Sequence, residues 1–309
     1  MNYSDFLSQI RCMVQSHMGS QAAVSIQPVL KNNNLRLDGL LILNPGENIS
    51  PTIYLNHYYE EYLDGTSMQD IIKDIELVYE THRCPAAFDT DIFRDFRRIR
   101  HKIAFRLINL EANPDLLADL PHIPFLDLAI VFYFTIENDF IGSSTALIHN
   151  NHMELWKTSP EELYSLALQN TRSLFGCEIR PMEQLIREMT GQSLPLPSGS
   201  RRNSDFLYVL TNRDRIYGAS CILYRDILEQ FAKQVESSFY ILPSSIHEVI
   251  LISAERSPSP QSLQQMVHEI NQTELAAEEI LSDNVYLYRT DTKELELAAP
   301  HTQRERTSR

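Results

Sequence analysis

The sequence has little of what marks the common nucleotide-binding and redox enzymes. Only nine of its 309 residues are glycine, and none of them forms the GxGxxG or GxxxxGK[ST] pattern that holds a phosphate group. The four cysteines, Cys12, Cys84, Cys177 and Cys221, include no CxxC pair. A zinc ribbon or a dithiol redox site is therefore not encoded in recognisable form. The sequence predicts four reduced thiols and no cofactor.

Basic charge is also scarce. With 27 Lys and Arg against 41 Asp and Glu, the formal net charge is −14, which argues against general binding to nucleic acid or to an anionic membrane. The basic exceptions are few: Arg94, Arg97, Arg98, Arg100, Lys102, Arg201 and Arg202. Asp91 and Asp95 are interleaved with the first cluster, so we interpret it as a solvated helix face. A nucleic-acid partner is not expected.

Long apolar runs are missing as well. The longest, from Phe125 to Ile136, has 12 residues and contains Asp127, whereas a membrane-spanning helix needs ~20. The start, MNYSDFLSQIRC, has neither the basic region nor the apolar core of a secretory signal. Hydrophobic residues make up 43% and charged residues 22%, as in ordinary globular proteins. These features predict a folded cytoplasmic protein without a membrane partner.

The first part of the chain predicts a helix, a hairpin and a second helix. Apolar residues recur at helical spacing from Ser4 to Met18. Alternation from Val24 to Leu43, interrupted by KNNN, predicts a β-hairpin that ends at Asn44-Pro45-Gly46. Thr52–Leu55 is expected to form a short third strand. A capped helix with the apolar stripe of Met68, Ile71, Ile72, Ile75 and Val78 follows Thr66-Ser67.

The middle of the chain is predicted to be helical. Phe88–Glu111 has the pattern of an amphipathic helix, and Phe125–Glu137 that of a buried helix, although a strand has the same apolar signature. Ser159-Pro160-Glu161-Glu162 is a strong helix start, with a capping hydroxyl, a proline at the first turn and two acids facing the helix dipole. That helix is expected to reach Leu174, and another to span Met182–Met189.

A composition change then marks the best internal boundary. Residues 190–204 read TGQSLPLPSGSRRNS, a stretch rich in Gly, Ser and Pro without an apolar period. We therefore predict an α+β protein in which residues 1–189 hold an N-terminal hairpin or short sheet and a helical middle. Residues 190–204 are the linker, 205–297 a C-terminal β-α-β-β unit with a final hairpin around Asp291-Thr292-Lys293, and 298–309 a loose tail.

The C-terminal unit suggests a candidate binding edge. Strands are predicted over Phe206–Asn212, Phe239–Pro243 and Ile246–Ile252, with a helix over Ala219–Val235 between the first two. A crossover helix makes its flanking strands parallel and brings their carboxyl ends to one edge, where α/β sheets bind ligands. The candidate binding edge defined in this way consists of Asn212, Arg213, Asp214, Ser244, Ser245, His247 and Glu248.

Two kinds of catalytic chemistry have candidate residues in the sequence. In a regular strand His247 and Glu248 point to opposite faces, whereas Ser245 and His247 share one, so a Ser-His nucleophilic pair is conceivable without a GxSxG elbow or an orienting acid. The alternative is that the serines bond the turn backbone. His149, His152 and Glu154 suit Zn²⁺ chemically, but their spacing differs from that of the HExxH motif and the sequence shows no third ligand. A polar loop is the competing interpretation there.

Several phrases together resemble a bacterial family, domain of unknown function 5688. They are LDGLLIL, ISPTIYLNHYYEEY, FLDLAIVFY, ALIHNNHMELW, ELYSLALQNT, FLYVLTN, YGAS, YILPSSIHEVILI and EEILSDNVYLY, and they cover nearly the whole chain. A looser similarity extends to domain of unknown function 1444, which carries Arg-Asp after Pro-Ser where this chain has Ile246-His247. The resemblance implies a cytoplasmic bacterial setting and assigns no activity.

These observations favour a non-catalytic binding module, accessory or regulatory, with a protein or small-molecule partner at the candidate binding edge. The alternative is a hydrolase or metal-dependent enzyme that uses His247, Glu248, Asn212 and Arg213, or His149 and His152. An enzyme would bring these groups together in a concave pocket. A binding module would leave many of them bonded to the backbone.

Overall fold

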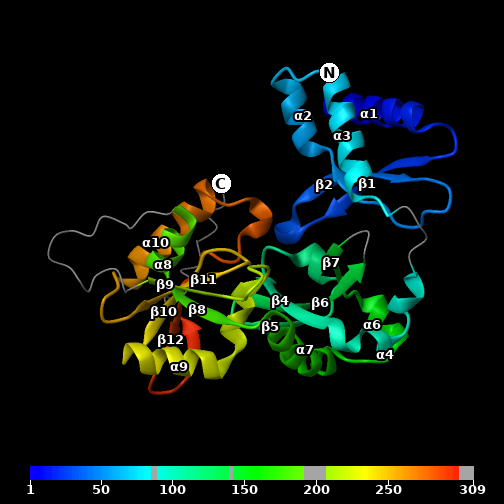
Figure 1. Ribbon diagram of the computed structural model, residues 1–309. Helices are drawn as coiled ribbons and strands as arrows, with labels where there is room; N and C mark the ends of the chain where they lie inside the picture. The colour runs from blue at the N-terminus through cyan, green and yellow to red at the C-terminus, as the bar shows by residue number, and fades with distance from the viewer. Residues whose placement is uncertain (85–88, 139–141, 191–206, 299–309) are drawn as a thin grey trace, which may run out of the picture.

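The computed structural model describes residues 1–84, 89–138, 142–190 and 207–298 (Figure 1). Within these ranges, helices combine with three antiparallel sheets, which confirms the predicted α+β class. No helix in the described ranges has both the length and the apolar character needed to cross a membrane. The predicted linker and tail fall almost entirely outside the described residues.

The N-terminal lobe, residues 3–82, is a three-stranded sheet covered by three helices. Its strand order is β1-β2-β3, and it stands above the rest of the chain in Figure 1. The predicted hairpin, third strand and Ser67-capped helix are confirmed, and the first helix begins at Tyr3 with Asn2 as its cap. The elements are α1 (Tyr3–Met18), β1 (Ala23–Leu30), η1 (Asn32–Asn34), β2 (Arg36–Leu43), β3 (Ile53–Tyr54), α2 (Asn56–Leu63) and α3 (Met68–His82).

The lobe has its own core. Phe6, Ile10, Leu40 and Ile75 are fully buried in it, because helical spacing on α1 and α3 and strand alternation on β2 direct apolar residues to one place. Tyr3 of α1 stacks on Phe6, and the Tyr59 and Tyr62 rings of α2 pack against it at a tilt. This separate cluster makes the lobe a distinct packing unit within the chain.

The second sheet corrects two helix predictions. Of the predicted helix Phe88–Glu111, Phe88 lies outside the described residues, and the rest forms the short turns η2 (Thr90–Phe93), α4 (Phe96–Ile99) and η3 (Arg100–Lys102), followed by β4 (Ile103–Asn109). Phe125–Glu137 is mostly β6 (Leu128–Asn138), the central strand of the sheet. Strand β4 pairs with one edge of β6, and β5 and β7 pair one after the other with the opposite edge. Residues 128–134 are buried on both faces, and a strand buried on both faces has no alternation that distinguishes it from a buried helix.

The remaining elements around this sheet follow the sequence more closely. Ser159 Oγ accepts the Glu162 N–H and Pro160 opens α7, as the capping signal predicts. The Thr171 hydroxyl of α7 accepts the backbone N–H of Phe105, so α7 covers one face of the sheet. The elements are α5 (Pro114–Leu117), β5 (His122–Phe125), β7 (Gly142–Leu147), α6 (Asn150–Trp156) and α7 (Pro160–Phe175).

The third sheet has the strand order β13-β12-β10-β11-β9-β8. Strands β9 and β10 run in the same direction, as the crossover argument predicts, but antiparallel β11 lies between them. The strands are β8 (Glu178–Pro181), β9 (Leu207–Thr211), β10 (Phe239–Pro243), β11 (Val249–Ser253), β12 (Tyr286–Tyr288) and β13 (Leu295–Leu297). The helices are α8 (Met182–Thr190), η4 (Gly218–Leu223), α9 (Arg225–Val235), α10 (Pro260–Thr273) and η5 (Ala277–Glu279).

Two details here differ from the prediction and matter for the site. The strand expected over Ile246–Ile252 begins only at Val249, so Ser245, His247 and Glu248 lie in a turn and the alternation argument does not apply to them. The helix expected over Ala219–Val235 is divided at Tyr224, which ends η4 and precedes α9. In this region Gly218 and the His247 carbonyl lie close to the end of β9.

The third sheet is covered on both faces and is tied to the second. Ile241 packs with Phe231 of α9, whereas the next residue, Leu242, packs with Leu263 of α10. Strand alternation therefore places α9 and α10 on opposite faces. Asp127, at the start of β6, accepts hydrogen bonds from three side chains of the last segment, Ser282, Asn284 and Tyr286.

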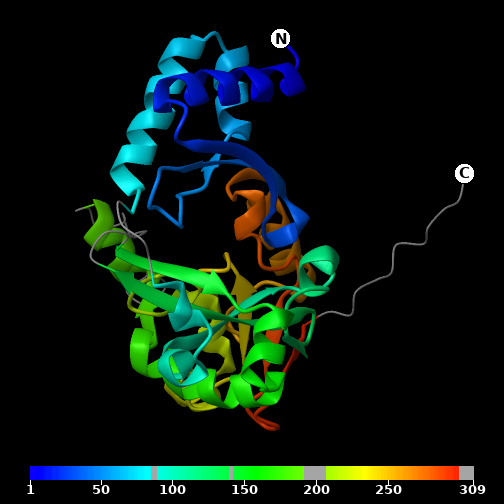
Figure 2. The ribbon, with the colours of Figure 1, turned by 90° about the vertical axis from the view of Figure 1, so that its right-hand side faces the viewer.

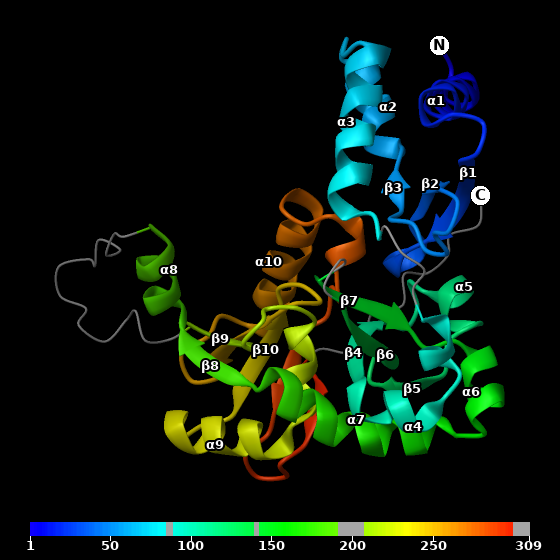
Figure 3. The ribbon, with the colours of Figure 1, turned by 45° about the vertical axis from the view of Figure 1, so that its right-hand side comes forward.

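The N-terminal lobe touches the rest of the chain through the hairpin turn η1. Asn32 Nδ2 donates to the Glu278 carbonyl at 2.7 Å, and Asn33 Nδ2 donates to the carbonyls of Ala277 and Ile280 at 2.7 and 2.8 Å. The Asn33 N–H donates to Asn113 Oδ1 at 2.7 Å. Figures 2 and 3 show the dark-blue hairpin end beside the orange segment that follows α10.

Candidate functional site

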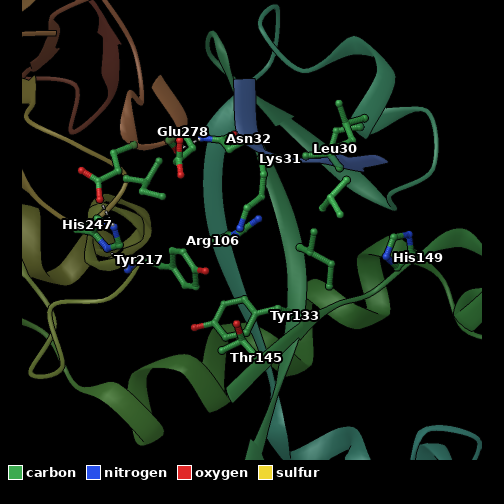
Figure 4. Close-up of a pocket in the computed structure, with 15 residues that line it drawn as sticks. Leu30, Lys31, Asn32, Arg106, Tyr133, Thr145, His149, Tyr217, His247 and Glu278 are labelled. Carbon is green, nitrogen blue, oxygen red and sulfur yellow. Dashed lines mark hydrogen bonds and ion pairs between the residues drawn. The ribbon is translucent and has the colours of Figure 1, made fainter. Parts of the chain in front are cut away.

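A cavity of about 470 Å³ lies where the N-terminal lobe and the second and third sheets meet. Figure 4 shows its walls: Lys31 and Asn32 from the hairpin turn, Arg106 and Tyr133 from the second sheet, and Tyr217 and His247 from the third. This volume is within the range of ~300–1,000 Å³ usual for small-molecule sites. The cavity has a polar end and an apolar end. The full lining is Val29, Leu30, Lys31, Asn32, Arg106, Leu116, Tyr133, Thr145, Leu147, His149, Tyr217, Ile246, His247, Glu278 and Glu279.

Strand register explains why four of these side chains share one wall. Ala104 pairs with Tyr133 across β4 and β6, and Tyr133 pairs with Leu147 across β6 and β7. Directly opposed residues project to the same face, and so do residues two apart on a strand. Arg106 and Tyr133 therefore lie on the face opposite α7, together with Leu147 and Thr145.

Arg106 is the unusual member of this wall. It lies in an otherwise apolar strand, its Nε is buried without a hydrogen-bond partner, and no carboxylate of the described residues lies within 4.0 Å of it. Its guanidinium carbon lies 4.6 Å from the centre of the Tyr217 ring, a cation–π contact. Arg106 as a whole is half-buried, and a cation that loses part of its hydration without gaining a counter-ion costs free energy, so this position favours an anion beside Arg106.

Tyr217 and His247 form an aromatic pair next to Arg106. Their ring centres are 5.8 Å apart with an angle of 14° between planes, and the Tyr217 backbone N–H donates to His247 Nδ1 at 3.2 Å. Tyr217 has φ +57°, a left-handed conformation that is uncommon and costly for a non-glycine residue. In this conformation the Tyr217 ring lies between the Arg106 guanidinium and the His247 imidazole (Figure 4).

The protonation state of His247 follows from its surroundings. Burial lowers its pKa below the ordinary value; Glu279 and Glu248 oppose this and Arg106 adds to it. Because Nδ1 accepts the Tyr217 N–H, the neutral ring carries its proton on Nε2, which lies 3.8 Å from Glu279 Oε1. At neutral pH His247 is therefore an uncharged hydrogen-bond donor at the rim.

Two more polar atoms of the lining lack partners among the described residues. Asn32 is 6% exposed, and its Oδ1 is buried without a donor, while its Nδ2 is used by the Glu278 carbonyl. Tyr133 is 3% exposed, and burial is the main cause that raises its pKa above the ordinary value. Its hydroxyl therefore remains a donor at physiological pH.

Of the seven residues of the candidate binding edge, His247 alone lines this cavity. Asn212 is buried, and its side chain bonds the backbone N–H and carbonyl of Ile216. The Arg213 side chain lies against Gly176, and Asp214 is exposed, Ser244 and Glu248 half-buried. The end of β9 is held against the turn that carries His247, since Thr211 Oγ1 donates to the His247 carbonyl at 2.9 Å.

The geometry at Ser245 and His247 is that of a turn. Ser245 Oγ accepts the His247 backbone N–H at 3.0 Å, and the Ser245 N–H donates to the Glu248 carbonyl at 3.1 Å. The imidazole is bonded to Tyr217 and not to the serine hydroxyl. A Ser-His nucleophilic pair needs that hydroxyl-to-imidazole contact, so this arrangement positions the backbone instead.

His149 and His152 form a helix start. His152 Nδ1 accepts the His149 backbone N–H at 2.9 Å, and His149 Nδ1 lies 2.7 Å from Asp119 Oδ2. Burial lowers the pKa of His152, with a smaller contribution from His149, and Glu154 is exposed. Among the described residues, no three His, Cys, Asp or Glu side chains are grouped closely enough to hold a metal ion.

Sequence reasoning missed Arg106, Lys31 and Asn32. The signal for Arg106 was present: a single charge inside IAFRLIN, which is apolar on both sides. It was overlooked because the whole of Phe88–Glu111 was interpreted as a helix with a basic face. Lys31 and Asn32 lie in a turn sequence, and nothing in KNNN distinguishes a turn that lines a cavity from one that faces solvent.

The fold and the cavity together define an α+β protein with a small-molecule-sized pocket at a lobe junction. A family model described as "Family of unknown function (DUF5688)" matches residues 3–290, and the chain belongs to this family. No curated protein matches the chain, and no solved structure does.

Proposed function

We propose that the protein is a binding module for a small anionic ligand, held in the cavity between the N-terminal lobe and the two larger sheets. The observation that carries the proposal is Arg106, a half-buried cation without a carboxylate partner among the described residues. Planar guanidinium groups bind carboxylate and phosphate oxygens with two hydrogen bonds. Nε is one of the two donors that such a contact uses.

Neighbouring groups support the same ligand charge. Lys31 lies 4.5 Å from the centre of the Tyr54 ring and makes no ion pair with a described carboxylate. The Tyr133 hydroxyl and the neutral His247 Nε2–H add two donors at the same cavity. Glu278 and Glu279 also line the cavity, so its lining as a whole is not cationic, and the favourable place for an anion is beside Arg106 and not the cavity in general.

The setting we propose is the bacterial cytoplasm. All four cysteines are free thiols, as is usual in a reducing compartment. A role as an accessory or regulatory module is consistent with a binding pocket that lacks a bonded nucleophile and base.

The test is calorimetric titration of the full chain with small carboxylates and with inorganic phosphate, comparing wild type with Arg106→Gln. We expect binding to wild type and at least a tenfold loss in the variant, since charge-assisted hydrogen bonds contribute about 1.5–3 kcal/mol. Arg97→Gln is the matched control, because Arg97 is exposed and its replacement changes the net charge equally. Equal affinity of both variants for every anion would overturn the proposal.

A further inference from the structure

The cavity has a second, chemically opposite end, which points to a ligand that is more than an anion. Asn32 Oδ1 is a buried acceptor without a donor among the described residues, and its orientation is fixed because Nδ2 donates to the Glu278 carbonyl. A buried acceptor left unpaired costs about 1–3 kcal/mol. The position therefore favours an N–H or O–H donor on the ligand.

Two carboxylates lie at the same end. Glu278 and Glu279 line the cavity, and Glu279 Oε1 lies 3.8 Å from His247 Nε2. Figure 4 shows Glu278 next to Asn32, with Arg106 directly below them. These carboxylates disfavour negative charge at their own end of the cavity, whereas a positively charged donor a few atoms away from the anionic group satisfies Asn32 and both acids.

The other end of the cavity is mainly apolar, with His149 beside it (Figure 4). Leu30 and Leu147 line the cavity and pack on the small cluster around Leu116. Figure 4 places Leu30 and His149 on the side of Arg106 away from His247. The order along the cavity is thus acceptor and acids, then the cation, then an apolar space.

We propose that the ligand is a free α-amino acid with an apolar side chain, whose carboxylate pairs with Arg106 and whose ammonium donates to Asn32 Oδ1. The ammonium faces Glu278 and Glu279, and the side chain occupies the space between Leu30 and Leu147. A short peptide with a free amino terminus presents the same ammonium but places an amide where the carboxylate would be. The inference rests on the proposed anion site and adds the class of molecule.

Matched ligands separate the two ends. The full chain is titrated with L-leucine, L-methionine and L-phenylalanine, and then with N-acetyl-L-leucine, L-leucinamide and leucyl-glycine. We expect at least one of the free amino acids to bind, with each blocked derivative of leucine at least tenfold weaker if leucine is the ligand. If leucyl-glycine binds more tightly than each of the three amino acids, the ligand is a peptide with a free amino terminus and the proposal of a free amino acid is wrong.

A pair of variants tests the acceptor. Asn32→Asp and Asn32→Leu both lose the bond to the Glu278 carbonyl, but only the first keeps an oxygen acceptor. We expect Asn32→Asp to bind the amino acid at least tenfold more tightly than Asn32→Leu. Equal affinities would show that Asn32 does not contact the ligand.

The outcomes also distinguish this inference from the proposed function. If phosphate or N-acetyl-L-leucine binds in an Arg106-dependent way while none of the three amino acids does, the anion site stands and the amino-acid inference is wrong. If L-leucinamide binds as tightly as L-leucine and Arg106→Gln has no effect, the anion site itself is wrong. Absence of binding by all three amino acids at 1 mM, roughly the upper end of useful Kd values, overturns the inference.

Discussion

Replacing Gly218 by alanine tests how the end of β9 is held against the turn that carries His247. A methyl group at this position would stand 2.6 Å from the His247 carbonyl oxygen and 2.7 Å from the Asn212 backbone nitrogen, and closer still to Thr211 Oγ1. Carbon atoms do not approach backbone atoms so closely, and neither backbone group is at the end of a flexible side chain. The backbone itself has to move.

The expected cost has two parts. Overpacking in a well-packed region costs about 1–3 kcal/mol, and loss of the hydrogen bond from Thr211 Oγ1 to the His247 carbonyl adds about 1 kcal/mol. Gly218→Ala should therefore lower the free energy of unfolding by roughly 2–4 kcal/mol. Because Tyr217 and His247 line the cavity, ligand affinity should fall as well.

Urea denaturation followed by circular dichroism measures this cost. Thr211→Val is the control, since it removes the hydrogen bond without adding a clash; it should cost about 1 kcal/mol. A cost for Gly218→Ala no greater than that of Thr211→Val would refute the reasoning, because it would mean that the backbone can separate freely at this point.

Three other predictions concern charge. The pKa values of His247 and His152 are lowered in the fold, so below a pH of about 6.5 the unfolded chain binds more protons than the folded chain and the protein loses stability. Urea midpoints should therefore fall between pH 7.5 and pH 5.5, and they should fall less in the double variant His152→Gln, His247→Asn than in wild type. An equal fall in both proteins would contradict the lowered pKa values. Asp127→Asn replaces an acceptor of three side-chain donors and should lower the free energy of unfolding by about 2–3 kcal/mol, with a loss under about 0.5 kcal/mol arguing against a role in joining the sheets. Asp226→Ala removes the two hydrogen bonds between Asp226 and Arg172, but both side chains are nearly half exposed. Thermal denaturation should therefore show that the free energy of unfolding falls by at most about 1 kcal/mol. A larger fall would mean that solvent screens this ion pair poorly.

Local signals predicted the parts of the fold that local physics determines. The Ser159-Pro160 and Ser67 helix starts, the Val24–Leu43 hairpin and the final hairpin are all present, since caps, turn residues and periodicity act within a few residues. The direction of β9 and β10 was also predictable from the length of the crossover. That β11 lies between them was not, because strand order depends on contacts between segments distant in the sequence.

The errors have a common physical cause. The segments Phe125–Glu137 and Phe88–Glu111 include strands that tertiary packing buries on both faces or nearly so. In such strands the apolar residues show neither the helical period nor the alternation of a half-exposed strand. Of the candidate binding edge, only His247 lines the cavity. His247 reaches the cavity, whereas Arg106 and Asn32 join it from segments 141 and 215 residues earlier in the chain, and only the folded structure brings these three side chains together.

The hairpin turn η1 joins the N-terminal lobe to the rest of the chain and also forms a wall of the cavity. The same residue, Asn32, donates to the Glu278 carbonyl and lines the cavity, and its Oδ1 has no donor among the described residues. If the proposed ligand binds there, it would contact both walls. By linkage it would then stabilise the contact between the lobe and the rest of the chain, and a variant that weakens this contact would lower the affinity for the ligand. Binding would in this way be read out as rigidity of the lobe, which is a signal that a partner protein could recognise without touching the ligand.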